Sequence, residues 1–120
     1  MQSESKDLSE RLLGFAASSI KPAVKLDRSM AGKHIANQLM RAASSAGANY
    51  EEACGAESRA DFIHKMQLVL KESRESLYWL KLAERSELIP SKDLQPLRNE
   101  ADELIKIVAK SVITAKGKAK

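Results

Sequence analysis

The most informative part of this sequence is the stretch Gly47-Ala48-Asn49-Tyr50-Glu51-Glu52-Ala53. It closes a run in which every residue from Ala42 to Asn49 is small, inside a helical pattern. Small residues allow another helix to approach closely, and a glycine in mid-helix costs up to about 1 kcal/mol relative to alanine. The side chains of the polar Asn-Tyr-Glu-Glu cluster that follows need hydrogen-bonding or ionic partners. We therefore predict a closely packed helical bundle with a kink or a close helix crossing at Gly47.

Composition supports an all-helical protein. The chain has 120 residues, of which 43% are hydrophobic and only 4% aromatic, with five glycines and three prolines. This balance favours helices and leaves little turn signal for a sandwich or a barrel. We expect a single domain over residues 1–120, with a basic tail from about 115 to 120.

Apolar residues at three-four spacing predict four helices. The predicted helices run from about Asp7 to Leu26, Ser29 to Gly55, Ser58 to Ser86 and Asp93 to Thr114. Their connections are short, and short connections between long helices give antiparallel neighbours. The predicted fold class is therefore all-α, an up-down-up-down antiparallel four-helix bundle.

The predicted helix boundaries rest on capping residues and prolines. The predicted N-caps are Asp7 with Glu10, Ser29, Ser58 with Asp61, and Asp93, which places Pro96 in the first turn of the last helix. Pro22 interrupts the first helical pattern, and we expect it to kink that helix or to split off its last turn.

The third predicted helix carries apolar residues on two sides. The seam for the bundle core comprises Ile63, Met66, Leu70, Ser73, Leu77 and Leu80. A second set lies off that seam and comprises Phe62, Leu68, Val69, Trp79 and Leu82. One side of a helix in a single bundle should contact water, so the second set predicts a subunit interface. The alternative is a broad core face with Trp79 partly exposed.

The same helix carries a basic strip, which comprises Lys71, Arg74, Tyr78, Lys81 and Arg85. Four cations and one aromatic ring on one line could contact phosphates and stack on a base. The alternative is a solvated face with salt bridges to neighbouring helices, and it is the stronger one for an isolated chain. Oligomeric symmetry would favour binding, because the field of each strip would add to the next. The net charge is only +4.

The residues that usually carry catalysis or bind metals do not form a pattern here. His64 follows Asp61 by three residues, but the second such motif of a di-metal bundle is absent because Ala31 precedes His34 by three. We expect Cys54 to be a buried, inert thiol, since no base stands beside it in the sequence. There is no glycine-rich phosphate loop. We predict no catalytic residues, no metal and no cofactor.

The sequence also bears on location. The single cysteine suits a reducing compartment, and the polar segment Met1–Glu10 predicts no signal peptide. No stretch approaches the length of about 18 apolar residues that a membrane span needs. We expect a cytoplasmic protein without a membrane partner.

The order of several motifs resembles a known family. These motifs are His34-Ile35-Ala36-Asn37-Gln38-Leu39, the stretch 47–53, Phe62-Ile63-His64-Lys65-Met66, Lys71-Glu72-Ser73-Arg74-Glu75 and Tyr78-Trp79-Leu80. They resemble the bacterial four-helix-bundle proteins encoded in intervening sequences of large-subunit ribosomal RNA genes. They are also similar to the accessory protein of diversity-generating retroelements. The resemblance covers roughly residues 8–113.

This resemblance implies an up-down bundle that assembles as a ring, most often a homopentamer, without enzymatic activity. For the retroelement relatives it implies a basic surface that binds nucleic acid and a reverse-transcriptase partner. We expect a non-enzymatic, homo-oligomeric scaffold that binds RNA or DNA. The alternatives are a protein-binding adaptor with no nucleic-acid role and, more remotely, a metal-dependent bundle enzyme.

Overall fold

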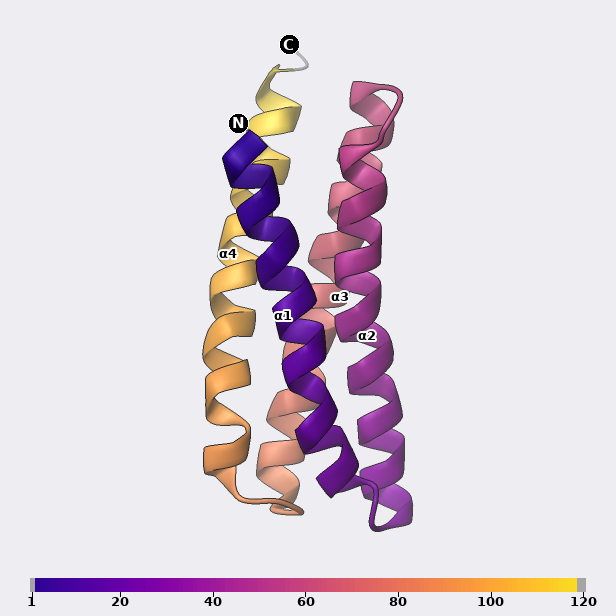
Figure 1. The fold of residues 1–120 in the computed structure, drawn as a ribbon, viewed down its shortest axis with the longest axis vertical. Coiled ribbons are helices and arrows are strands. Elements are labelled where there is room, and N and C mark those ends of the chain that lie inside the picture. The colour runs from indigo at the N-terminus through magenta and orange to yellow at the C-terminus, as the bar shows by residue number, and fades with distance from the viewer. Residues whose placement is uncertain (1, 119–120) are drawn as a thin grey trace.

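The computed structural model describes the backbone of residues 2–118 and the side chains of residues 7–117. Four helices make up the fold: α1 (Gln2–Leu26), α2 (Met30–Cys54), α3 (Arg59–Ser86) and α4 (Gln95–Lys118), with a short 3-10 turn, η1 (Ser91–Asp93), before α4. Successive helices run in opposite directions along the long axis (Figure 1). The predicted all-α, up-down-up-down four-helix bundle is confirmed.

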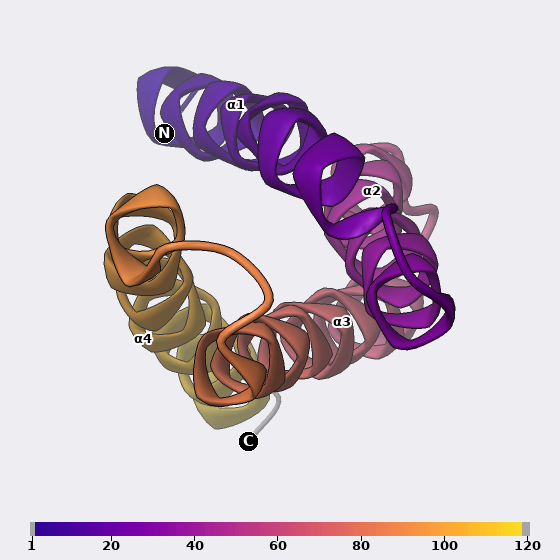
Figure 2. The same cartoon turned by 90° about the horizontal axis from the view of Figure 1, so that it is seen from below.

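The four helices follow one another around the bundle axis, so that α1 lies diagonally opposite α3 (Figure 2). The molecule is elongated, with principal extents of 49 × 21 × 20 Å. Contacts are extensive between α1 and α2, between α2 and α3, and between α3 and α4, but sparse between α1 and α4. The outward face of α3 is therefore remote from α1.

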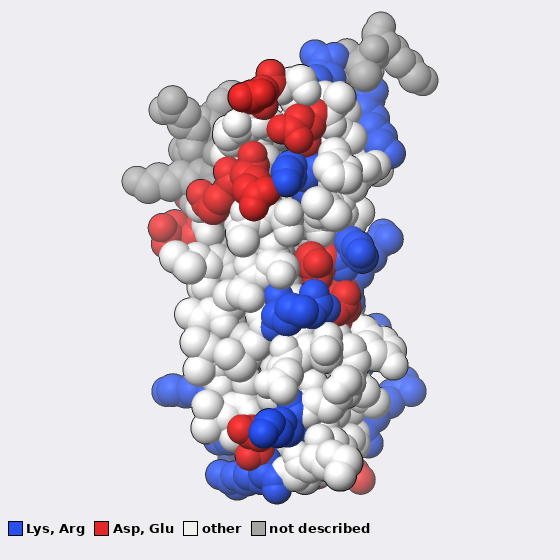
Figure 3. Space-filling model, turned by 90° about the vertical axis from the view of Figure 1, so that its right-hand side faces the viewer, with Lys and Arg blue, Asp and Glu red and all other residues white. Residues whose placement is uncertain are grey.

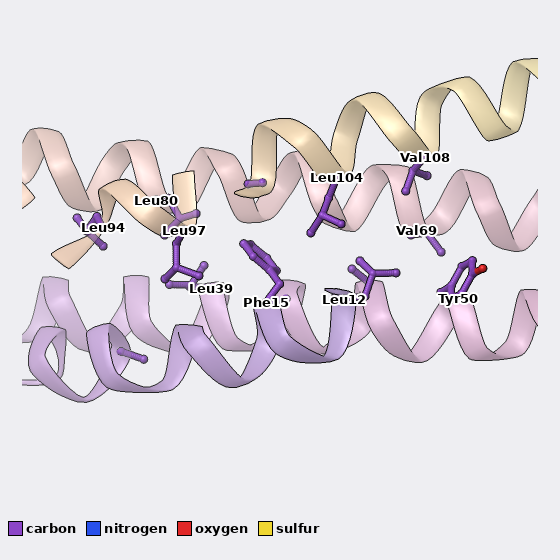
Figure 4. Packing of buried hydrophobic residues seen from close by; sticks show 14 of the residues in the cluster. Leu12, Phe15, Leu39, Tyr50, Val69, Leu80, Leu94, Leu97, Leu104 and Val108 are labelled. Carbon is purple, nitrogen blue, oxygen red and sulfur yellow. The ribbon is translucent and has the colours of Figure 1, made fainter. Parts of the chain in front are cut away.

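One continuous apolar core joins all four helices (Figure 4). Its fully buried members include Leu12 of α1, Leu39 of α2, Met66, Val69 and Leu80 of α3, and Leu94, Leu104 and Val108 of the last part of the chain. Tyr50 is also buried, with 5% of its surface exposed, and belongs to this core. The three-four apolar spacing seen in the sequence thus identifies the inward face of each helix.

Two of the predicted N-caps are confirmed. The Ser29 hydroxyl accepts a hydrogen bond from the Gly32 backbone N–H at 3.0 Å, and the Ser58 hydroxyl accepts one from Asp61 N–H at 3.0 Å. Both caps satisfy an N–H group that would otherwise lack a partner in the first helical turn. They explain why α2 and α3 begin where they do.

The other two predicted caps are wrong. Helix α1 begins at Gln2, so Asp7 lies inside it. Asp93 lies in η1 and pairs with Lys25 at 3.0 Å, which ties the α3–α4 connection to α1. Leu94 instead precedes α4, with its carbonyl accepting from Arg98 N–H at 2.9 Å. Pro96 does lie in the first turn, as predicted.

Pro22 does not split α1, because the helix continues through it to Leu26. Leu26 is 1% exposed and packs at the corner where α1 turns into α2. A Cβ atom built on Gly32 would lie 1.9 Å from the Leu26 carbonyl oxygen. The backbone at the end of α1 therefore leaves no room for a side chain at Gly32, a position that the sequence pattern did not single out.

The crossing predicted at Gly47 is present but less tight. A Cβ atom on Gly47 would lie 3.7 Å from Leu12 Cβ, which is ordinary van der Waals contact. The polar residues that follow form hydrogen bonds and an ion pair. Asn49 donates to the Ser45 carbonyl at 2.9 Å, and Glu51 accepts from the Ser9 hydroxyl. Glu52 pairs with Lys65. This polar cluster ties α2 to α1 and α3.

Candidate nucleic-acid interface

The basic strip lies on the outward face of α3. Successive residues are three or four apart, which keeps all five on one side of a helix. All of them are exposed: Lys71, Arg74, Tyr78, Lys81 and Arg85. Seen from the side in Figure 3, Lys and Arg gather along the right-hand edge and the lower end, whereas Asp and Glu gather near the upper end.

The four cations of the strip form no salt bridge with any side chain among residues 7–117. The alternative of a face neutralised by salt bridges to neighbouring helices is therefore not what the structure shows. The pKa of Glu84 is lowered mainly by a hydrogen bond from the Ser91 hydroxyl and then by Arg98, and Arg85 adds only a smaller long-range contribution. The strip presents its positive charge to solvent.

The neighbouring border between α2 and α3 is different, because its charges are paired. Arg41 of α2 contacts Glu72 at 3.3 Å and also pairs with Glu75. Lys65 pairs with Glu52 at 2.5 Å, and this carboxylate raises the pKa of Lys65. We call this set the paired border. It pairs Glu72 and Glu75 of α3 with Arg41 and leaves the cations of the strip without these carboxylates as partners.

Tyr78 is held by an aromatic neighbour. Its ring lies 5.2 Å from that of Trp79 at an interplanar angle of 81°, and His34 meets Trp79 from α2 at 5.5 Å. The Trp79 indole N–H donates to Glu75 at 3.3 Å. Edge-to-face contacts of this kind restrict ring orientation. Tyr78 is still 59% exposed, so a supported aromatic ring stands in the middle of the strip.

The five residues predicted as a subunit interface are not equivalent. Val69 is fully buried within the core of its own chain, because it falls on the inward line with Met66 and Leu80. It has no surface to offer to a second subunit, and its place in that prediction is corrected. Phe62 and Trp79 are partly buried and pack against the core.

The remaining two interface residues keep some exposure. Leu68 is partly exposed, and Leu82 is 37% exposed. The surface that α3 could offer to another subunit is thus reduced to four residues, Phe62, Leu68, Trp79 and Leu82. The prediction overlooked Val69's burial because it took a single narrow seam as the whole core face.

The described part of the chain contains no group of three or more His, Cys, Asp or Glu residues that could hold a metal ion. His34 contacts Trp79, and His64 is exposed. Cys54 is exposed at the end of α2, so the expectation of a buried thiol is wrong. Ala53 before it packs into the core, but α2 ends at Cys54 and the thiol itself faces solvent.

A shallow groove of about 300 Å³ lies between α1 and α4. At its rim the Arg11 guanidinium donates to both oxygens of Glu100, at 2.9 and 2.7 Å. These hydrogen bonds raise the pKa of Arg11. Both groups are satisfied by each other, which leaves no acid or base directed into the groove. A second shallow hollow lies beside the connection from α3 to α4.

Within the described residues, no helix is both long enough and apolar enough to cross a bilayer.

The architecture defines a class: small up-down four-helix bundles with long helices and a charged exterior. The model of the family described as "23S rRNA-intervening sequence protein" matches residues 10–110. The chain belongs to this family, which confirms the resemblance seen in the sequence motifs.

A solved structure supports the same assignment. It is a protein of unknown function from the S23 ribosomal protein family of Bacteroides thetaiotaomicron VPI-5482, 32% identical in sequence, with a TM-score of 0.81. The match covers 88% of this chain and 97% of that one. No curated protein matches the chain. Neither the family description nor the solved relative names a catalytic activity.

Proposed function

We propose that this protein is a non-enzymatic, cytoplasmic scaffold that forms a ring of five copies and binds RNA or DNA through the basic strip. The observation that carries this proposal is a line of four cations around an exposed tyrosine on α3, none of which forms a salt bridge with a described side chain. The name of the family supports a nucleic-acid context, since it refers to sequences within ribosomal RNA genes.

The dimensions of the strip suit a nucleic-acid backbone. From Lys71 to Arg85 the helix rises by about 21 Å at 1.5 Å per residue. Each strand of a duplex carries one phosphate per about 3.4 Å of axial rise, so a strip parallel to the duplex axis matches the rise of roughly six base pairs. Cations on one line without base-reading partners favour contacts to phosphates, which carry little sequence information.

The ring assembly would multiply this charge. Leu82 and the partly exposed Leu68 and Trp79 supply apolar surface on the side of α3 next to the strip, whereas Phe62 falls on the inward line with Leu80. Cyclic symmetry would repeat the strip at each subunit and sum the fields. Trp79→Glu should then lower the solution mass of the protein by light scattering. A reverse transcriptase remains a candidate partner on the basis of the resemblance to retroelement accessory proteins.

The experiment that tests the proposal compares two double variants that remove the same charge. Arg74→Ala with Lys81→Ala removes two cations from the strip, whereas Lys106→Ala with Lys110→Ala removes two exposed cations from α4. Fluorescence anisotropy with labelled RNA and DNA should show weaker binding for the first variant only. Equal losses of affinity in both variants would mean that the net charge of the protein, and not the strip, determines binding.

The second candidate function is a protein-binding adaptor, which the exposed Tyr78 and Leu82 favour because aromatic and apolar side chains anchor protein interfaces. If the wild-type protein binds neither RNA nor DNA at low salt, the adaptor function replaces the first proposal. In that case the strip would recognise an acidic protein surface.

A further inference from the structure

Helix α1 carries a second apolar line that faces away from the core. It comprises Leu13, Ala17, Ile20 and Val24, at spacings of four, three and four. Leu13 is 65% exposed, Ile20 49% and Val24 66%, and Ala17 is also exposed. The opposite face of the same helix supplies Leu8, Leu12 and Phe15 to the core. No side chain among residues 7–117 covers the outer line, which we call the α1 line.

The apolar surface continues onto α2. The contacts of Gly47 with Leu12 and of Gly32 with Leu26 fix the antiparallel register of the two helices. This register places Ile20 level with residues 38 and 39 of α2, one to two residues from Met40, which is 41% exposed. An apolar surface shared by two helices is costly to leave in water, and alternating spacings of three and four are those of paired helices.

The α1 line is nearly symmetric about its own centre, between Ala17 and Ile20. If a second α1 lies antiparallel across this centre, Leu13 faces Val24 of the other copy and Ala17 faces Ile20. The small side chain then meets the large one twice, which allows the two helices to interdigitate. A two-fold axis needs such a self-complementary surface.

The charges at the two ends of α1 favour the same arrangement. Exposed Asp7 and Glu10 lie at the N-terminal side of the line, whereas exposed Lys21 and Arg28 lie toward the C-terminal side. Asp27, which this arrangement places level with Glu10 of the other copy, offsets part of the basic charge at that end. Antiparallel helices bring the acidic end of one copy level with the basic end of the other, whereas parallel helices would place like charges together.

We infer that the α1 line binds the α1 line of a second copy of this chain in antiparallel, two-fold contact. This inference goes beyond the proposed ring, which uses α3 on the diagonally opposite side of the bundle (Figure 2). A two-fold contact and a cyclic contact can coexist in one assembly with dihedral symmetry. The two contacts can therefore be tested separately.

The contact geometry is tested by cross-linking in a Cys54→Ala background. Ala17→Cys with Ile20→Cys places thiols that face each other across the two-fold axis. Mild oxidation should produce a covalent dimer of twice 13.2 kDa on a non-reducing gel. The matched control is Lys110→Cys with Ile113→Cys, which has the same spacing on an exposed face of α4. Equal yields from both pairs would overturn the inference.

Solution mass supplies the second readout. Ile20→Glu should halve the mass measured by light scattering while circular dichroism stays unchanged. The matched control Ile113→Glu changes an isoleucine that is 73% exposed on α4 and should leave the mass unaltered. If Trp79→Glu lowers the mass and Ile20→Glu does not, the α1 contact is wrong while the ring stands. A monomeric wild-type protein would overturn both.

Discussion

The contact between α1 and α2 and the basic strip of α3 differ in what fixes their residues. In the α1–α2 contact, Gly32 leaves no room for a Cβ atom beside Leu26, and Gly47 meets Leu12 in ordinary contact. In the strip, Arg74 and Lys81 are exposed and form no salt bridge with any described side chain. The first region is explained by packing alone. Packing does not explain the exposed cations of the second region, so these cations are the candidates for a functional role.

The largest expected effect is on folding, from Gly32→Ala. The added Cβ would lie 1.9 Å from the Leu26 carbonyl oxygen, so the backbone at the α1–α2 corner would have to move. We expect a loss of about 3 kcal/mol in the free energy of unfolding, at the upper end for overpacking. Urea denaturation followed by circular dichroism measures it. Unchanged stability would show that this corner yields easily and that packing does not fix Gly32.

Gly47 gives the next largest effect, and its sign depends on the size of the substitute. Gly47→Ala fits the 3.7 Å space beside Leu12 and should raise stability by up to about 1 kcal/mol, since alanine is the better helix former. Gly47→Leu should overpack the crossing and lower stability by roughly 1–3 kcal/mol. Thermal melts of both variants measure these two changes in stability. A gain from leucine would mean that the crossing is loose.

These two glycines also show how far the sequence can predict the fold. The helical period and the Ser29 and Ser58 caps are local signals, so the four helices and the start of two of them could be predicted. Gly47 was identifiable because it stands inside a run of small residues. The role of Gly32 depends on Leu26 across a turn, a three-dimensional relation that no local pattern encodes.

The errors have similar physical causes. The N-terminal part of α1 is polar, so apolar periodicity could not detect that the helix begins at Gln2. Asp93 has a capping side chain, but Lys25 from a distant helix binds it instead. The strip residues were predicted as a line, and they form one. The α1 line has the same three-four spacing in the sequence, but the inward apolar set of the same helix is the one that the bundle core requires.

Tyr78→Ala tests the strip without changing its charge. The ring is 59% exposed and supported by Trp79, so its loss should have little effect on folding, within about 0.5 kcal/mol for a surface substitution. Affinity for single strands should fall roughly tenfold if a base stacks on the ring. Duplex binding should change much less. Competition binding with both forms measures this, and equal losses would exclude stacking.

The smallest expected effect lies beside the strip, at Glu84. The Ser91 hydroxyl donates to this carboxylate at 2.6 Å, and with Arg98 it lowers the pKa of Glu84. A lowered carboxylate pKa contributes stability above the pKa of the unfolded chain, and this is lost as pH falls through the folded pKa. Ser91→Ala should raise the pKa of Glu84, which an NMR titration measures. An unchanged pKa of Glu84 in this variant would mean that Arg98, and not the Ser91 hydroxyl, lowers it.

The most direct test of the central claim is the salt dependence of nucleic-acid binding. Each phosphate neutralised by the strip should contribute about −0.7 to −0.9 to the slope of log affinity against log salt. Four cations predict a slope of roughly −3 for each bound strip. Arg74→Ala with Lys81→Ala should flatten that slope by roughly 1.5 across all sequences, without altering the oligomer. No binding at about 50 mM salt, or a slope that this variant leaves unchanged, would contradict the assignment of the strip as the nucleic-acid interface.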